Sequence, residues 1–188
     1  MSNPEQSPYD DVLTLGDIAA VLTDRTLLRQ FGVVALTLLT AGLAFGLIPM
    51  LFGQYGDHNL LQLAGGPGAE QTAQTNQNNI GRLVYIFAPI LAPMLATVVT
   101  FVSSAVQDGR RRTVVPAAMA GAFVGCLLFL LVSTWLPHTQ FAVVENAFPF
   151  DSTVPPYDTA GVLLNGALSG LAGALGALGA ALAGSLLG

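Results

Sequence analysis

Four long runs of apolar residues alternate with shorter polar segments along the chain. The runs cover residues 31–53, 83–106, 113–136 and 160–188, and none of them contains Asp, Glu, Lys, Arg or His. A helix needs about 20 apolar residues to cross the hydrocarbon layer of a bilayer, and each run reaches that length. The pattern predicts an all-α, polytopic membrane protein with four transmembrane helices, at about residues 31–53, 83–106, 113–136 and 160–187.

The overall composition supports this prediction. Of the 188 residues, 53% are hydrophobic and only 9% are charged, whereas a soluble domain carries about 25% charged residues. So few charges cannot cover the surface of a soluble globule. Residues 31–188 should therefore form one four-helix transmembrane domain, preceded by the N-terminal segment 1–30, with no room for a separate soluble catalytic domain.

The N-terminal segment contains the signal for a short amphipathic helix. Thr14 and Asp17 have the spacing of a capping box, so a helix should start near Leu15. When the segment is wound as a helix, its apolar side chains fall on one side; these are Val12, Leu15, Ile18, Ala19 and Leu22. Such a helix lies in the membrane interface, either as a lead-in to the first span or as a docking helix for a cytoplasmic partner. The lead-in is favoured because it requires no partner.

The arginines are distributed unevenly over the two sides of the predicted spans. Arg25 and Arg29 precede the first span and residues 110–112 are all arginine, whereas Arg82 alone falls on the other side. Basic residues collect on the cytoplasmic side of membrane proteins. We therefore expect a multi-pass cell-membrane protein with both termini in the cytoplasm and with outer loops at residues 54–82 and 137–159. The polar run 70–79 predicts a flexible segment within the first of these loops.

Charge composition indicates an environment rather than a function. Lysine is absent, and eleven acidic residues against six arginines give a net charge of −5 and a sequence pI near 4.6. This balance is similar to that of proteins from extreme halophiles, whose acidic surfaces stay hydrated in concentrated salt.

Small residues mark the faces through which the predicted helices should pack. In the fourth span, glycine and alanine fall on one side of the helix and a stripe of leucines falls on the other. Helices in lipid associate where small residues let their backbones approach closely, so the glycine side should contact another helix. Glycines at the same four-residue spacing occur in the first and third spans. The predicted helix-packing residues are Gly42, Gly46, Gly121, Gly125, Gly166, Gly170, Gly173 and Gly184.

Two prolines and one asparagine are the candidates for a gate or a polar path. Pro89 and Pro93 should bend the second span, because each removes a backbone hydrogen bond from the helix. A bent helix can gate a pathway, but prolines also occur in membrane helices that gate nothing. Asn165 can hydrogen-bond to a neighbouring helix, although its place near the outer end of the fourth span also allows water to solvate it.

The chain lacks the residue patterns that carry chemistry. No ionisable side chain lies inside a predicted span, which argues against ion-coupled transport. No hydrolase, phosphate-binding or dinucleotide-binding motif occurs, so the sequence predicts neither an enzyme nor a cofactor. His58 and His138 are only weak candidates for a metal site, because they lack the spacing of known ligand pairs. The arginines at 110–112 are explained by orientation and contact with membrane lipids, without nucleic acid.

Two functional hypotheses fit this pattern. The first is a non-enzymatic integral membrane protein, a structural or accessory subunit that assembles through its glycine-rich helix faces into a homo-oligomer or a larger membrane complex. The second is a small transporter or channel component, in which Pro89, Pro93 and the hydroxyl-bearing helix faces would line a polar path. The absence of charge within the spans favours the first hypothesis.

Overall fold

The described part of the chain is almost entirely helical. The computed structural model describes residues 25–55, 69–106, 111–147 and 157–187. These ranges hold no strand and four helices, which are α2 (Arg25–Tyr55), α3 (Ala69–Val106), α4 (Arg111–Ala147) and α5 (Thr159–Leu187). The predicted all-α fold is confirmed for these residues. The amphipathic helix predicted to start near Leu15 lies outside them.

Each of these helices contains a segment long and apolar enough to cross a membrane. The four segments are Leu27–Pro49, Gly81–Ala105, Val115–Thr139 and Thr159–Ala183. The prediction of four apolar membrane-spanning helices is therefore confirmed at the level of length and composition, and it indicates a multi-pass membrane protein.

Two helices continue into segments that the sequence analysis assigned to loops. α3 begins at Ala69, so the prediction of a flexible segment at 70–79 was wrong, and α4 continues through Pro137 to Ala147. Adding a turn to an existing helix avoids the cost of nucleation. Glutamine and glutamate are also good helix formers, so a polar composition does not by itself end a helix.

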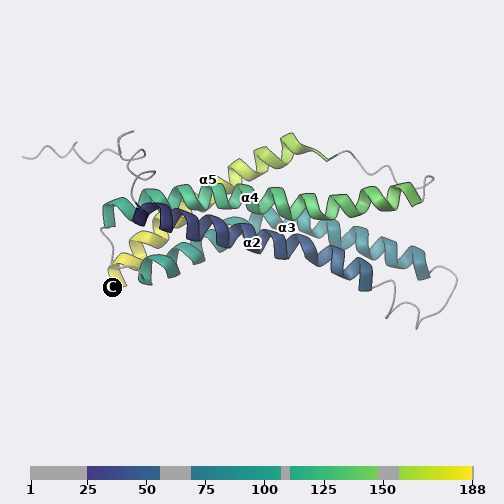
Figure 1. The fold of residues 1–188 in the computed structure, drawn as a ribbon, viewed down its shortest axis with the longest axis horizontal. Coiled ribbons are helices and arrows are strands. Elements are labelled where there is room, and N and C mark those ends of the chain that lie inside the picture. Colours follow the sequence, from purple (N-terminus) through teal and green to yellow (C-terminus); the bar gives the residue numbers. More distant parts are fainter. Residues whose placement is uncertain (1–24, 56–68, 107–110, 148–156, 188) are drawn as a thin grey trace, which may run out of the picture.

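α2, α3 and α4 run roughly along one another, and α5 lies obliquely against α3 and α4 (Figure 1). α2 packs chiefly on α4, α5 packs on both α4 and α3, and smaller contacts join α3 to α4 and to α2. The beginning of α2 and the end of α5 lie at the same end of the bundle (Figure 1). α2 and α4 therefore run in one direction, and α3 and α5 run in the other.

Small side chains make up much of the bundle interior, together with a few large ones such as Phe129, Leu38 and Leu130, and many large apolar side chains face outward. Buried alanines come from all four helices: Ala35 of α2, Ala88, Ala92 and Ala96 of α3, Ala117, Ala118 and Ala122 of α4, and Ala174, Ala177, Ala180 and Ala181 of α5. On the opposite side of α5, Leu175 is 67% exposed. Lipid chains are as apolar as leucine, so nothing drives bulky side chains inward, while small ones allow close contact between helices.

Candidate functional site

The crossing of α2 over α4 is built on glycine. A Cβ atom placed on Gly42 would lie 2.8 Å from the Cα atom of Phe129 and 2.9 Å from its carbonyl oxygen. A Cβ atom placed on Gly46 would lie 2.9 Å from the Cα atom of Ser133. Side chains do not approach backbone atoms so closely, so only the hydrogen atom of glycine fits at these two positions.

α4 contributes two glycines of its own to the same crossing. A Cβ atom on Gly121 would lie 2.9 Å from the carbonyl oxygen of Phe31, and one on Gly125 would lie 2.5 Å from Cδ1 of Leu38. Residue numbers increase in the same direction in both helices along the crossing, from the contact of Phe31 with Gly121 to the contact of Gly46 with Ser133. This order is expected for helices that run in the same direction. The two glycines of α2 and the two glycines of α4, each pair four residues apart, therefore lie at one interface.

Carbonyl oxygens face the glycines across this interface. The ideal Cβ position of Gly42 lies 2.9 Å from the Phe129 oxygen, and that of Gly46 lies 3.1 Å from the Ser133 oxygen. A Cα–H group directed at a carbonyl forms a weak hydrogen bond. The Ser133 carbonyl lacks its usual helical donor, because Pro137 has no N–H. Gly46 therefore lies beside a backbone oxygen that lacks its usual helical donor.

The glycine side of α5 lies against both α4 and α3. A Cβ atom on Gly170 would lie 2.8 Å from the ring of Phe123 in α4. One on Gly173 would lie 2.7 Å from Sγ of Cys126 in α4 and 3.4 Å from Cβ of Ala96 in α3. The predicted packing glycines that contact another helix of the same chain are Gly42, Gly46, Gly121, Gly125, Gly166, Gly170 and Gly173. The side-chain surroundings of Gly184 are outside the described set.

The two prolines of α3 lie beside α5. Because Pro93 has no N–H, the carbonyl oxygen of Pro89 loses its helical donor. The hydroxyl of Ser169 in α5 replaces that donor, with 3.0 Å between Oγ and the Pro89 oxygen. Thr97 Oγ1 donates to the Pro93 carbonyl at 2.9 Å. α5 therefore packs on α3 at its proline-interrupted turns and supplies the donor that the Pro89 carbonyl lacks.

The hydrogen bond from α5 to α3 comes from Ser169, whereas Asn165 is exposed. Sequence reasoning favoured Asn165, because a serine in a helix usually bonds to its own backbone. The signal that identifies Ser169 is indirect. Pro93 leaves an unpaired carbonyl at residue 89, and a small hydroxyl side chain on the glycine side of α5 can reach it.

A polar cluster that sequence reasoning missed joins α3, α4 and the start of α5. Tyr85 donates its hydroxyl to the Thr134 carbonyl at 3.0 Å. The Tyr157 hydroxyl lies 2.8 Å from Thr134 Oγ1 and donates to the Leu131 carbonyl at 3.4 Å. The rings of His138 and Tyr157 contact each other with centroids 5.1 Å apart. Tyr157 therefore attaches the beginning of α5 to α4.

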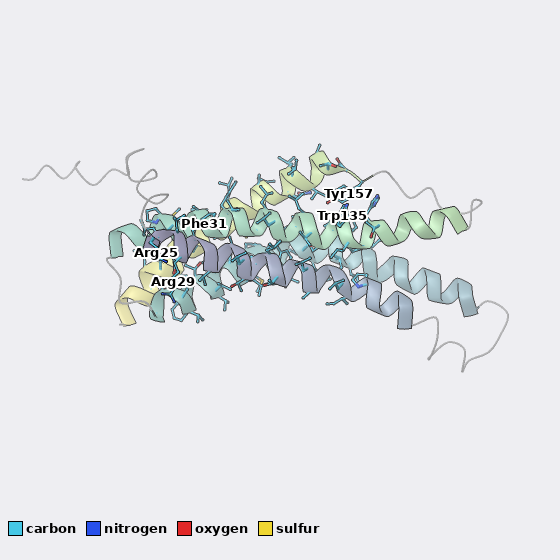
Figure 2. The ribbon with its side chains drawn as sticks, in the orientation of Figure 1. Arg25, Arg29, Phe31, Trp135 and Tyr157 are labelled. Carbon is cyan, nitrogen blue, oxygen red and sulfur yellow. The ribbon has the colours of Figure 1, made fainter. Side chains whose placement is uncertain are left out.

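Arg25, Arg29 and Phe31 lie toward one end of the bundle, and Trp135 and Tyr157 lie toward the other (Figure 2). Trp135 is 54% exposed, as expected for a tryptophan at a membrane interface.

The structure does not bring the two predicted histidines into a described site. His138 contacts Tyr157, and His58 lies outside the described residues. Within the described ranges, no group of three or more His, Cys, Asp or Glu side chains gathers in a way that could hold a metal ion.

No known protein family, curated protein or solved structure matches the chain. A functional proposal therefore rests on the arrangement of the described residues. It consists of glycine-built helix contacts, hydroxyls bonded to backbone carbonyls, and an outer surface of large apolar side chains.

Proposed function

We propose that this protein is a non-enzymatic structural or accessory subunit of a membrane assembly, either a homo-oligomer or a larger complex. One observation supports the proposal: glycines lie at the contacts between the helices of the chain, whereas large apolar side chains are exposed on the outside of the bundle. The glycine-rich faces, predicted above as the assembly surface, contact helices of the same chain, so contact with lipid or a partner falls to the outer surface.

The exposed stripe of α5 is the part of this surface best suited to a partner helix. It is formed by Leu164, Leu168, Leu171, Leu175 and Leu182. Alternating steps of four and three residues keep leucines on one side of a helix, and the same spacing lets them pack as knobs into holes of a facing helix. We name these five residues the leucine stripe.

A small transporter or channel component remains the second candidate, because polar groups recur along one side of α3. Going along the helix, these are the Tyr85 hydroxyl, the Pro89 carbonyl, and the side chains of Thr97, Thr100 and Ser103. Most of these groups are already bonded to protein atoms. That pairing favours a structural role over a path for solutes.

A flux assay separates the two candidates. Purified protein in liposomes should show no proton- or sodium-dependent uptake of solute, because a charged group at membrane depth is the usual requirement for such coupling. Uptake would be followed with an imposed gradient and compared with protein-free liposomes. A gradient-dependent signal that only the protein-containing liposomes give would replace the subunit proposal with the transporter.

Both termini face the cytoplasm in this proposal, because Arg25 and Arg29 lie at the end of the bundle where α5 ends (Figures 1 and 2). Single cysteines at Thr75 and Ser152, in a Cys126→Ala background, should react with an impermeant thiol reagent in intact cells. A cysteine at Ser2 should react only after the cells are opened. The reverse pattern would invert the orientation.

A further inference from the structure

A buried polar cluster between α2 and α3 contains two oxygen atoms without a hydrogen-bond partner. Gln30 is 0% exposed, and its Nε2 donates to Oγ of Ser103 at 2.8 Å. Ser103 Oγ in turn donates to the carbonyl oxygen of Thr100 at 3.0 Å. Gln30 Oε1 and Thr100 Oγ1 remain unpaired among the described residues, although Thr100 is also 0% exposed.

Thr100 differs from other threonines in these helices. Thr37, Thr97 and Thr134 each donate to the carbonyl oxygen four residues earlier. That bond is the usual way in which a helix satisfies a threonine hydroxyl. Thr100 makes no such bond to Ala96, so its hydroxyl needs a partner from outside its own helix backbone.

Exchanging the positions of the oxygen and nitrogen of the Gln30 amide does not give every buried polar atom a hydrogen-bond partner. The Ser103 hydroxyl could then rotate and donate its proton to the amide oxygen placed beside it instead of to the Thr100 carbonyl. The exchanged amide would also turn its two N–H groups toward the unpaired side. Either assignment leaves a buried polar atom of Gln30 without a partner.

We infer that this cluster binds one water molecule, which donates to Gln30 Oε1 and accepts from the Thr100 hydroxyl. Buried polar groups in proteins are nearly always satisfied, and an internal water with about three hydrogen bonds is the common solution where protein atoms fall short. A metal cation would require a larger shell of oxygen ligands than these two. The water completes a hydrogen-bonded link from α2 through Gln30 to Thr100 and Ser103 of α3.

A crystal structure from a lipidic mesophase, with rubidium chloride as the salt, tests this inference directly. We expect a density peak within hydrogen-bond distance of both Gln30 Oε1 and Thr100 Oγ1, without anomalous signal at the rubidium absorption edge. An anomalous peak at that position would assign a monovalent cation and overturn the water. A map without any peak there, with the Thr100 hydroxyl bonded to the Ala96 carbonyl, would also overturn it.

Two variants at one position give an independent readout. Thr100→Val keeps the shape of the side chain but removes the hydroxyl, so the peak should disappear and the Tm should fall by about 3 °C. Thr100→Ser keeps the hydroxyl and should retain the peak and most of the Tm. A loss of Tm for Thr100→Ser as large as that for Thr100→Val would contradict a bound water, because Thr100→Ser keeps the hydroxyl.

Discussion

Replacing Gly42 with alanine should destabilise the bundle by about 1 to 3 kcal/mol, the usual cost of overpacking a close-packed site. The one added carbon atom would lie 2.8 Å from the Cα atom of Phe129 and 2.9 Å from its carbonyl oxygen. Both are backbone atoms, so no side chain can turn away, and α2 must move off α4. The free energy of unfolding would be measured by circular dichroism during titration of mixed micelles with SDS.

Gly32→Ala is the matched control, because it makes the same change in the same helix. No heavy atom lies within 4 Å of a Cβ atom placed on Gly32. Alanine is a better helix former than glycine by about 1 kcal/mol, so this variant should keep or raise the stability. Equal behaviour of the two variants would show that the α2–α4 crossing does not depend on close approach at Gly42.

Gly173→Leu should also be strongly destabilising, on the order of 1 to 3 kcal/mol by the usual cost of overpacking. Its first added atom would meet Cys126 Sγ at 2.7 Å and Ala96 Cβ at 3.4 Å, and the rest of the side chain would have to separate α5 from α3 and α4. Losing close packing is costly here because no hydrophobic effect operates between helices in lipid. The fraction of folded protein would be followed in a thermal series in detergent.

Two controls in α5 isolate the effect of position. Gly179→Leu makes the same change where nothing lies within 4 Å of the added Cβ atom, so the variant should stay within about 0.5 kcal/mol of the parent. Leu175→Ala should cost less than Gly173→Leu, because Leu175 is 67% exposed and lipid chains can fill the space. A greater loss for Leu175→Ala would reverse the assignment of the packed and outer faces of α5.

The four helices that are long and apolar enough to span a membrane could be predicted from the sequence, because charge is excluded from hydrocarbon and the uncharged runs are clear. The ends of the helices could not. Gln30 falls outside the predicted first span, yet it lies inside α2, is fully buried and hydrogen-bonds to Ser103 of α3. At residues 70–79 and beyond Pro137, cooperative extension of an existing helix outweighs local composition.

The candidate site was predictable in part. Glycine spacing indicates which side of a helix packs, but it does not say which helix is the partner. The order and direction of all four helices determine that Gly42 contacts Phe129 and that Gly173 contacts Cys126. The bond from Ser169 to the Pro89 carbonyl depends on the same packing, because the donor and the acceptor are 80 residues apart.

The size of the protein extracted from native membranes tests the subunit proposal most directly. In mild detergent and high salt, native mass spectrometry should find the chain bound to further copies or to a partner. Leu168→Ala/Leu175→Ala, within the leucine stripe, should reduce that species while the variant remains folded by circular dichroism. Ile86→Ala/Ile90→Ala, on the exposed side of α3, should leave it intact. A parent chain that is found only as a folded monomer would contradict the proposal.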